Sequence, residues 1–203
     1  MTGSVSPLTG RAEGRPSVRT CPASHRGSAV GLFLQLWRDL DAVVERDASR
    51  SGRREALWHA PWQGLALHRI AHRRYARGHR LSANALTWLA RIVSGMEIHA
   101  GAEIGERAFI DHGFGVVIGE TAVVGDDVTL YHQVTLGSRG WLQDGPPDEP
   151  RHPAIGDRVL IGVGASVLGA VTVGDDCHIR AHTLVLEDVP ERHESPKARR
   201  TGT

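Results

Sequence analysis

Residues 98–136 read IHAGAEIGERAFIDHGFGVVIGETAVVGDDVTLYHQVTL, and residues 155–185 read IGDRVLIGVGASVLGAVTVGDDCHIRAHTLV. Both stretches repeat an aliphatic residue, mostly at every sixth position, to give thirteen repeats: Ile98, Ile104, Ile110, Ile118, Val124, Leu130, Leu136, Ile155, Ile161, Val167, Val173, Ile179 and Val185. A glycine follows seven of them, and a small or β-branched residue usually stands two positions before. Such a period predicts a parallel β-helix, in which three hexapeptides make one triangular coil around the aliphatic side chains. We expect the glycines to turn the corners, where a missing Cβ lets the chain bend.

Two breaks interrupt this ladder of repeats. The step from Ile110 to Ile118 is eight residues long, and residues 137–154, which are polar and rich in Gly and Pro, separate Leu136 from Ile155. Such a segment is typical of a loop extruded from the coil. Each break places a histidine beside a charged residue, as Asp111-His112 and as Arg151-His152. Because loops on a rigid scaffold often carry function, both pairs are candidate site residues.

The rest of the chain has a different organisation. Residues 1–30 are rich in Ser, Gly, Pro and Arg and predict a disordered tail, although a transit peptide has a similar composition. Residues 31–93 space their apolar side chains as helices do and predict a small helical N-terminal subdomain. We expect the β-helix over residues 94–190 and a charged, solvated tail over residues 191–203.

Composition excludes several classes of function. The net charge of +1 offers no electrostatic case for nucleic acid or for an acidic membrane surface. No apolar run approaches the ~18 residues that a membrane span requires. Cys21 and Cys177 lie far apart and form no CxxC pair, as expected for the reducing cytosol. We therefore expect a cytoplasmic protein with no nucleic-acid or membrane partner.

From about Leu32 to Pro190 the chain resembles the serine O-acetyltransferases, hexapeptide-repeat enzymes that make O-acetylserine for cysteine synthesis. The most specific segment joins Asp111-His112-Gly113 to Gly119-Glu120-Thr121-Ala122, in register with Arg151-His152-Pro153. Shorter matches are Trp37-Arg38-Asp39 with Glu45-Arg46-Asp47, His68-Arg69-Ile70-Ala71-His72, Gly95-Met96-Glu97-Ile98-His99 and Val134-Thr135-Leu136-Gly137. The resemblance implies a mainly β fold, a left-handed parallel β-helix preceded by a small α-helical subdomain.

The resemblance also implies acetyl-CoA-dependent acetylation of L-serine, by direct attack of the hydroxyl on the thioester. A serine hydroxyl is a weak nucleophile near neutral pH and needs a base within hydrogen-bond reach. By resemblance His112 is that base, Glu97 orients it, and His152 is a second active-site histidine. Imidazole suits the role because its ordinary pKa lies near ~6.5.

The remaining site residues also follow from the resemblance. Asp47 and Asp111 match the acids that bind the substrate ammonium group, and Arg151 matches the residue that binds its carboxylate. Acetyl-CoA is implied as the acyl-donor substrate, and no metal is expected. The residues that would approach the coenzyme are Gly137, Ser138, Gly164, Ala165 and Ala181.

Three departures from the family pattern lie on the coenzyme side. Residues 138–141 are Ser-Arg-Gly-Trp, where the family usually has Gly-Thr-Gly-Lys. Residues 179–182 are Ile-Arg-Ala-His, where the family usually has Ile-Gly-Ala-Gly. After Pro190 the usual final coil, Val-Val-Gly-Val-Pro-Ala, is missing. These changes predict weak acetyl-CoA binding.

Other functions remain open at this stage. The acceptor could be another hydroxy-amino acid such as homoserine, or the chain could be a non-catalytic homologue with impaired CoA binding. A zinc-dependent carbonic anhydrase shares the fold but needs three metal-binding histidines, and the spacing of His178 and His182 does not match.

The resemblance also bears on assembly. The family forms trimers or dimers of trimers, with the active site between neighbouring prisms. The additional N-terminal helices that join two trimers are not evident here, which favours a homotrimer. In the family the tail can insert into the sulfhydrylase that consumes O-acetylserine and typically ends in Ile. The terminal Thr203 carries a hydroxyl that is costly to bury, so we expect no stable cysteine synthase complex.

Overall fold

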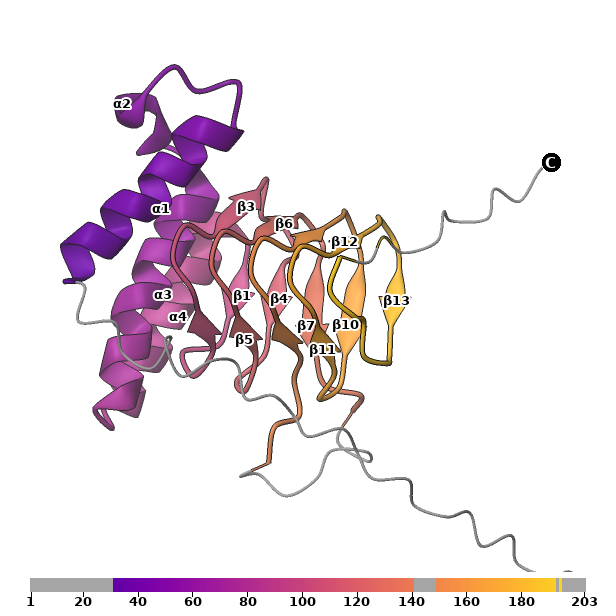
Figure 1. Cartoon of the computed structure of the whole chain (residues 1–203). Helices are drawn as coiled ribbons and strands as arrows, with labels where there is room; N and C mark the ends of the chain where they lie inside the picture. The colour runs from indigo at the N-terminus through magenta and orange to yellow at the C-terminus, as the bar shows by residue number, and fades with distance from the viewer. Residues whose placement is uncertain (1–30, 141–148, 193, 195–203) are drawn as a thin grey trace, which may run out of the picture.

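Thirteen short strands build a three-sided, left-handed parallel β-helix, shown in Figure 1. This computed structural model describes residues 31–140, 149–192 and 194. Each strand carries one aliphatic residue of the predicted ladder, which confirms the hexapeptide period. The strands are β1 Glu97–Ile98, β2 Glu103–Ile104, β3 Phe109–Asp111, β4 Val117–Ile118, β5 Val123–Val124, β6 Thr129–Tyr131, β7 Thr135–Gly137, β8 Ala154–Ile155, β9 Leu160–Ile161, β10 Ser166–Leu168, β11 Thr172–Val173, β12 His178–Ile179 and β13 Leu184–Val185.

The three sheets stack coil on coil. One sheet has the order β1-β4-β7-β10-β13, the second β2-β5-β8-β11 and the third β3-β6-β9-β12. The register pairs ladder residue with ladder residue, for example Ile98 with Ile118 and Ile118 with Leu136. The aliphatic side chains therefore form columns inside the prism, where Leu136, Ile155 and Ile161 are fully buried. Removing this apolar surface from water is the main stabilising term, about 25 cal/mol per Å².

The glycines that follow the aliphatic residues have a different role from the predicted one. None of these seven glycines, all within the described residues, has a left-handed backbone. They are glycine because the next coil lies too close for a side chain. A Cβ on Gly105 would lie 2.4 Å from the carbonyl oxygen of Gly125 and 2.5 Å from the Asp126 carboxylate. Stacking distance, not bending, therefore selects glycine here.

At these corners the left-handed backbone conformation occurs two residues after the glycine position, and the residues that adopt it are not glycines. These residues are Arg107, Asp127, Arg158, Asp176 and Arg192, with φ of 57–58°. They stack one per coil, and their charges alternate in sign. Arg107 Nε donates to Asp127 Oδ1 at 2.8 Å, and Arg158 Nε donates to Asp176 Oδ1 at 2.7 Å. We call this column of five residues the charged edge.

Four helices cover the N-terminal end of the prism (Figure 1). They are α1 Leu32–Arg46, α2 Arg53–Ala56, α3 Ala60–Ala76 and α4 Arg80–Ser94. The apolar face of α1 packs Leu40 and Val43 against Ala56 and against Phe109 of β3. Pro61 lies in the first turn of α3, where the missing N–H has no helical partner to lose.

A buried ion pair attaches these helices to the first coil. Arg69 Nε of α3 donates to Asp39 Oδ2 of α1 at 3.1 Å, and both side chains are almost fully buried. Asp39 Oδ1 also accepts from the backbone N–H of Arg107 at 3.0 Å, and the Arg69 guanidinium donates to the carbonyls of Ile104 and Gly105. Removing one partner would leave an uncompensated buried charge, which typically costs about 3–5 kcal/mol. The helices therefore have one fixed position on the prism.

At the C-terminal end, backbone pairing continues past Pro190 into the expected charged tail, where Glu191, Arg192 and Glu194 are exposed. Val189 pairs with Val173, and Glu194 pairs with His178, so the coil continues through the last described residue. Arg192 takes the left-handed corner conformation and completes the charged edge. The expected tails over residues 1–30 and 195–203, and positions 141–148 of the expected loop, lie outside the described residues.

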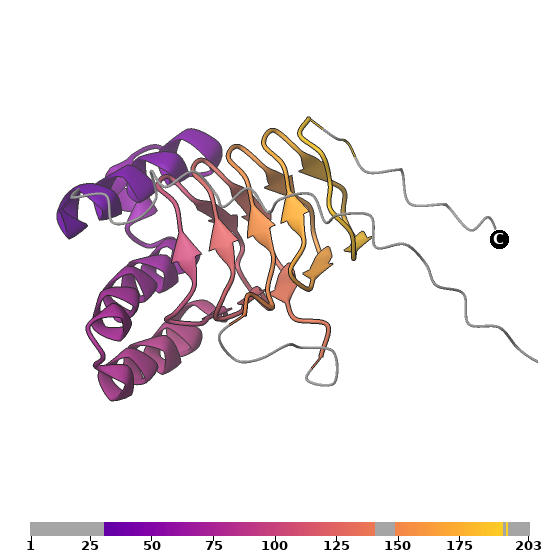
Figure 2. The same cartoon turned by 60° about the horizontal axis from the view of Figure 1, so that its bottom comes forward.

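The described ends of the expected loop, residues 137–140 and 149–154, lie between β7 and β8 (Figure 2). Its first residue, Gly137, ends β7, and its last, Ala154, begins β8.

In the parts of the chain that the structure describes, no helix is both long enough and apolar enough to cross a membrane.

Candidate active site

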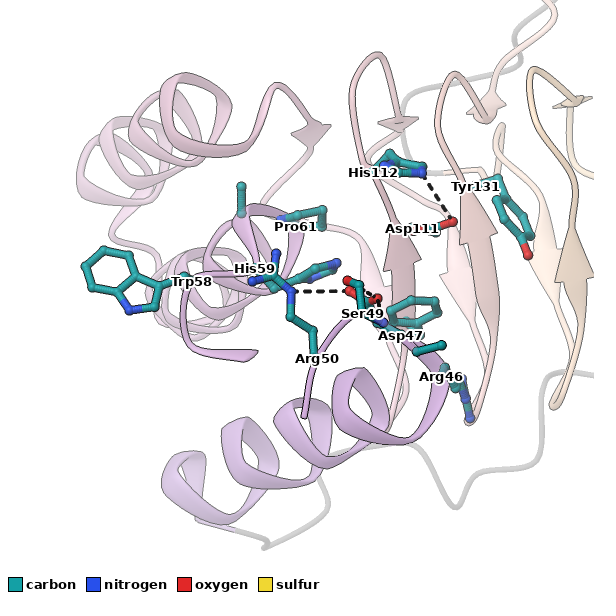
Figure 3. A pocket seen from close by; sticks show the side chains of 13 residues that line it. Arg46, Asp47, Ser49, Arg50, Trp58, His59, Pro61, Asp111, His112 and Tyr131 are labelled. Carbon is teal, nitrogen blue, oxygen red and sulfur yellow. Dashed lines mark hydrogen bonds and ion pairs between the residues drawn. The ribbon is translucent and has the colours of Figure 1, made fainter. Parts of the chain in front are cut away.

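A cavity of about 540 Å³ lies where the helices meet the first two coils (Figure 3). The end of α1 contributes Asp47, the start of α3 contributes His59, and the prism contributes Asp111, His112 and Tyr131. The structure thus brings Asp47 to one cavity with the neighbouring pair Asp111 and His112, although Asp47 is far from that pair in sequence.

His112 occupies the eight-residue step of the ladder. Its backbone is left-handed (φ 61°), and Gly113 and Gly115 are also left-handed, so the extra residues form a tight turn after β3. Its side chain is largely exposed, and its Nε2 lies 3.7 Å from Asp111 Oδ2. The ring of His132, one coil further, meets the His112 ring edge-on at 5.6 Å between centroids. The turn therefore presents an imidazole to solvent beside a carboxylate.

Asp47 follows the last residue of α1 and is held by its own turn. Asp47 Oδ1 accepts from the Ser49 hydroxyl at 2.6 Å and from the Ser49 backbone N–H at 2.9 Å. Arg50 Nε lies 3.4 Å from Asp47 Oδ2. The hydrogen bonds from Ser49, with a smaller contribution from Arg50, hold the pKa of Asp47 below its usual range. Asp47 and Asp111 thus supply two carboxylates to one cavity, an arrangement that suits a bound ammonium group.

His59 is a cavity residue that the sequence analysis missed. It precedes α3, its Nδ1 accepts from the backbone N–H of Trp62 at 3.3 Å, and its ring stacks on Phe109 with centroids 5.8 Å apart. Burial lowers the pKa of His59, which favours the neutral ring. Because Nδ1 accepts the Trp62 hydrogen bond, the proton of that ring is on Nε2. Nothing in the local periodicity distinguishes this histidine from an ordinary helix-capping residue.

Arg151 and His152, just before β8, form a second cluster with Glu120 and Thr121 of the corner between β4 and β5. The Arg151 guanidinium pairs with the Glu120 carboxylate. The Thr121 hydroxyl oxygen accepts from the backbone N–H groups of Arg151 and His152, at 3.0 and 3.1 Å. The backbone N–H of Thr121 donates to His152 Nδ1 at 3.2 Å, and the Thr121 hydroxyl lies 2.9 Å from the same nitrogen. Since Nδ1 accepts, the ring proton of the neutral His152 is on Nε2.

The two clusters do not meet within one chain. Neither Arg151 nor His152 lines the cavity at His112. Glu97, predicted to orient His112, instead forms an exposed ion pair with Arg91 at 3.0 Å. The predicted catalytic and substrate-binding residues therefore lie in separate places on the chain.

The predicted coenzyme residues lie on two corners of the prism. Gly137 ends β7 of the first sheet and Ser138 follows it, while Gly164 has a left-handed backbone (φ 65°) at the corner that also carries His112. Ala181 is exposed, whereas the side chain of Ala165 is buried in the core, so Ala165 has only backbone atoms to offer a ligand.

Two residues that depart from the family pattern, His182 and Arg139, lie against prism backbone. A Cβ on Gly164 would lie 2.6 Å from the His182 ring, which therefore covers that glycine. The Arg139 guanidinium lies over Gly169 and donates to the Leu168 carbonyl at 3.4 Å and to the Leu186 carbonyl. Both departures thus cover prism backbone on the side where the resemblance expects the coenzyme.

The described residues contain no group of three or more His, Cys, Asp or Glu side chains that could hold a metal ion. His178 instead lies 3.9 Å from Glu194, and His182 covers Gly164.

Comparison with known proteins identifies the family. Residues 152–187 match the bacterial transferase hexapeptide family model, described as six repeats. A serine acetyltransferase of Helicobacter pylori is 47% identical over 159 residues, which cover 78% of this chain and 90% of that protein. A soybean serine acetyltransferase complexed with serine superposes with a TM-score of 0.76 at 38% identity, covering 83% of this chain and 68% of the other. A Brucella abortus serine acetyltransferase in complex with coenzyme A superposes with a TM-score of 0.73 at 37% identity, covering 78% of this chain and 62% of the other. The chain belongs to the serine acetyltransferase family.

Proposed function

We propose that this chain transfers the acetyl group of acetyl-CoA to the hydroxyl of L-serine, giving O-acetylserine and CoA. The observation that carries the proposal is the meeting of His112, Asp111 and Asp47 in one cavity. It places a candidate base beside two carboxylates that suit an amino-acid ammonium group. Solved relatives that bind serine and coenzyme A support the same pair of substrates.

In the proposed reaction His112 accepts the proton of the serine hydroxyl as the oxygen attacks the thioester carbonyl carbon. The C–S bond then breaks, and the imidazolium of His112 returns the proton to the departing thiolate. His152 presents an Nε2–H, which suits hydrogen bonding to negative charge that develops during acyl transfer. Arg151 offers a planar fork that matches the serine carboxylate.

We further propose a homotrimer, in which Arg151 and His152 of one chain face His112 of the next. The separation of the two clusters within one chain supports this assembly. Exposed apolar side chains also follow His112 in the chain, with Phe114 71% and Val117 38% exposed. Exposed apolar side chains gathered in one region often mark a protein interface.

The acyl donor has a surface to approach, although a narrower one than the family pattern provides. Gly137 and Gly164 have no side chain to obstruct a ligand, but the His182 ring covers Gly164. We therefore propose that acetyl-CoA is the donor and that it binds weakly. We also propose that the chain forms no stable cysteine synthase complex.

A thiol-release assay tests the proposed function. Purified protein is mixed with acetyl-CoA and a panel of L-serine, L-homoserine and L-threonine, and released CoA is measured. We expect the highest kcat/KM with L-serine. A preference for homoserine would change the acceptor, whereas absence of turnover together with absence of acetyl-CoA binding by calorimetry would favour a non-catalytic homologue.

A further inference from the structure

Tyr75, in the last helical turn of α3, reaches the corner that carries Arg151. Its hydroxyl donates to Glu120 Oε1 at 2.6 Å. The other carboxylate oxygen of Glu120, Oε2, accepts from the Arg151 guanidinium. A tyrosine, a carboxylate and an arginine thus form one chain of contacts from the helical subdomain to the predicted carboxylate-binding residue.

Tyr75 is itself fixed in place. The Arg80 guanidinium lies 5.1 Å from the centroid of its ring, and the ring of His99 meets it edge-on at 5.7 Å between centroids. The hydrogen bond from Tyr75, followed by that from Arg151, holds the pKa of Glu120 below its usual range. Glu120 is therefore a full negative charge with a partner on each oxygen, which restricts the directions in which it can hold a guanidinium.

We propose that Tyr75 is a positioning residue, which acts through Glu120 to fix the Arg151 guanidinium where it binds the carboxylate of the amino-acid acceptor. This inference rests on the proposed function. An arginine side chain has many rotamers, and a guanidinium held beforehand loses less freedom when a carboxylate binds. The effect should therefore fall on the KM for the amino acid rather than on kcat or the KM for acetyl-CoA.

The chain contains a matched control for Glu120. Glu106 follows Gly105 as Glu120 follows Gly119, at the same place in a hexapeptide. Glu106 also pairs with an arginine, Arg38, and its side chain is 20% exposed, compared with 31% for Glu120. Glu106→Gln therefore removes a comparable ion pair elsewhere on the molecule.

The experiment measures thiol release by the wild-type chain and by Tyr75→Phe, Glu120→Gln, the double variant and Glu106→Gln. We expect Tyr75→Phe to raise the KM for serine about three- to tenfold and Glu120→Gln to raise it further, with kcat and the KM for acetyl-CoA nearly unchanged. Because Tyr75 acts through Glu120, the double variant should match Glu120→Gln alone. Glu106→Gln should leave the KM for serine unchanged.

Two results would overturn the inference while leaving the proposed function intact. One is an unchanged KM for serine in Tyr75→Phe and Glu120→Gln. The other is an equal rise from Tyr75→Phe with and without Glu120. No serine turnover by the folded wild-type chain would instead overturn the proposed function, and this inference with it.

Discussion

A left-handed backbone at His112 (φ 61°) lets the chain turn within two residues of β3 and still present an imidazole outward. Non-glycine residues rarely adopt this conformation, which costs roughly 1 kcal/mol or more. The Gly113–Gly115 turn and its packing on Met96 and Pro61 keep the conformation in place. The same turn brings Asp111 beside the ring, so one local structure supplies both base and carboxylate.

Replacing the base should therefore affect turnover far more than folding. We expect His112→Ala to lower kcat by about 10²–10⁴, the usual contribution of a positioned general base. Glu97→Gln should cost less, because Glu97 pairs with Arg91 in this chain and could act only on the orientation of His112. Steady-state kinetics with circular dichroism as a folding control measures both. A larger loss for Glu97→Gln would show that the two assigned roles are wrong.

The sequence predicts site residues that interrupt a regular local pattern. It does not predict site residues that reach the site only through the packing of one element on another. Asp111-His112 and Arg151-His152 stand out because they fall in breaks of an otherwise regular ladder. His59 and Tyr75 stand in helical segments without such a break, and only the docking of α3 on the prism brings them to the sites.

At the scale of elements, α3 buries a histidine that cannot take up a proton easily. His68 is almost fully buried, and its Nδ1 forms no hydrogen bond with any described residue. Burial, together with the positive charge of Arg69 and the nearby His72 and His99, holds the pKa of His68 well below its usual value. The folded chain therefore keeps this ring neutral at a pH where the unfolded chain protonates it.

This difference predicts acid sensitivity. Below about pH 6.5 the unfolded state binds the proton that the folded state refuses, so stability falls as pH decreases, by up to about 1.4 kcal/mol per pH unit. His68→Gln should flatten the dependence of the free energy of unfolding on pH between 6.5 and 5, measured by urea titration. His79→Gln, which removes an exposed histidine from the same helical subdomain, is the control for the loss of a histidine as such. An unchanged slope in His68→Gln would refute the prediction.

The corner between the third and first sheets carries a second testable element. The His182 ring covers Gly164, on the surface where the resemblance expects the coenzyme. His182→Gly keeps a residue that tolerates its left-handed backbone (φ 56°) and uncovers Gly164. We expect the KM for acetyl-CoA to fall severalfold with the KM for serine unchanged. A rise in the KM for acetyl-CoA would instead make the imidazole a contact for the donor.

The ladder predicts the strands well, because a period of six places one aliphatic residue in each strand. It does not predict the stacking contacts that select glycine after the aliphatic position, since these come from the coil above. The period also does not predict that strand pairing continues to Glu194, because Val189 is followed by Pro190 and charged residues rather than by another aliphatic repeat.

At the scale of the whole molecule, the separation of Arg151 from His112 predicts that activity is shared between chains. His112→Ala and Arg151→Ala should each be nearly inactive alone. If a site takes one residue from each of two neighbours, statistical mixing by co-refolding restores about one quarter of wild-type activity. Mixing the folded variants without refolding is the control. Co-refolded mixtures no more active than the separate variants would place the whole site in one chain.

Because Arg and Asp alternate along the charged edge, coils can be added without breaking the alternation only in even numbers. Duplicating residues 158–175 would add one coil and stack Arg158 on a second Arg158, whereas duplicating residues 158–191 would add two coils and keep the alternation of Arg and Asp. Like charges at one corner repel, and only the even insertion avoids this repulsion. We expect the two-coil variant to melt near the wild-type Tm and the one-coil variant to melt lower, as followed by circular dichroism. Equal Tm values for the two variants would show that the charge order along this edge does not limit the number of coils. Such a prism could then lengthen one coil at a time.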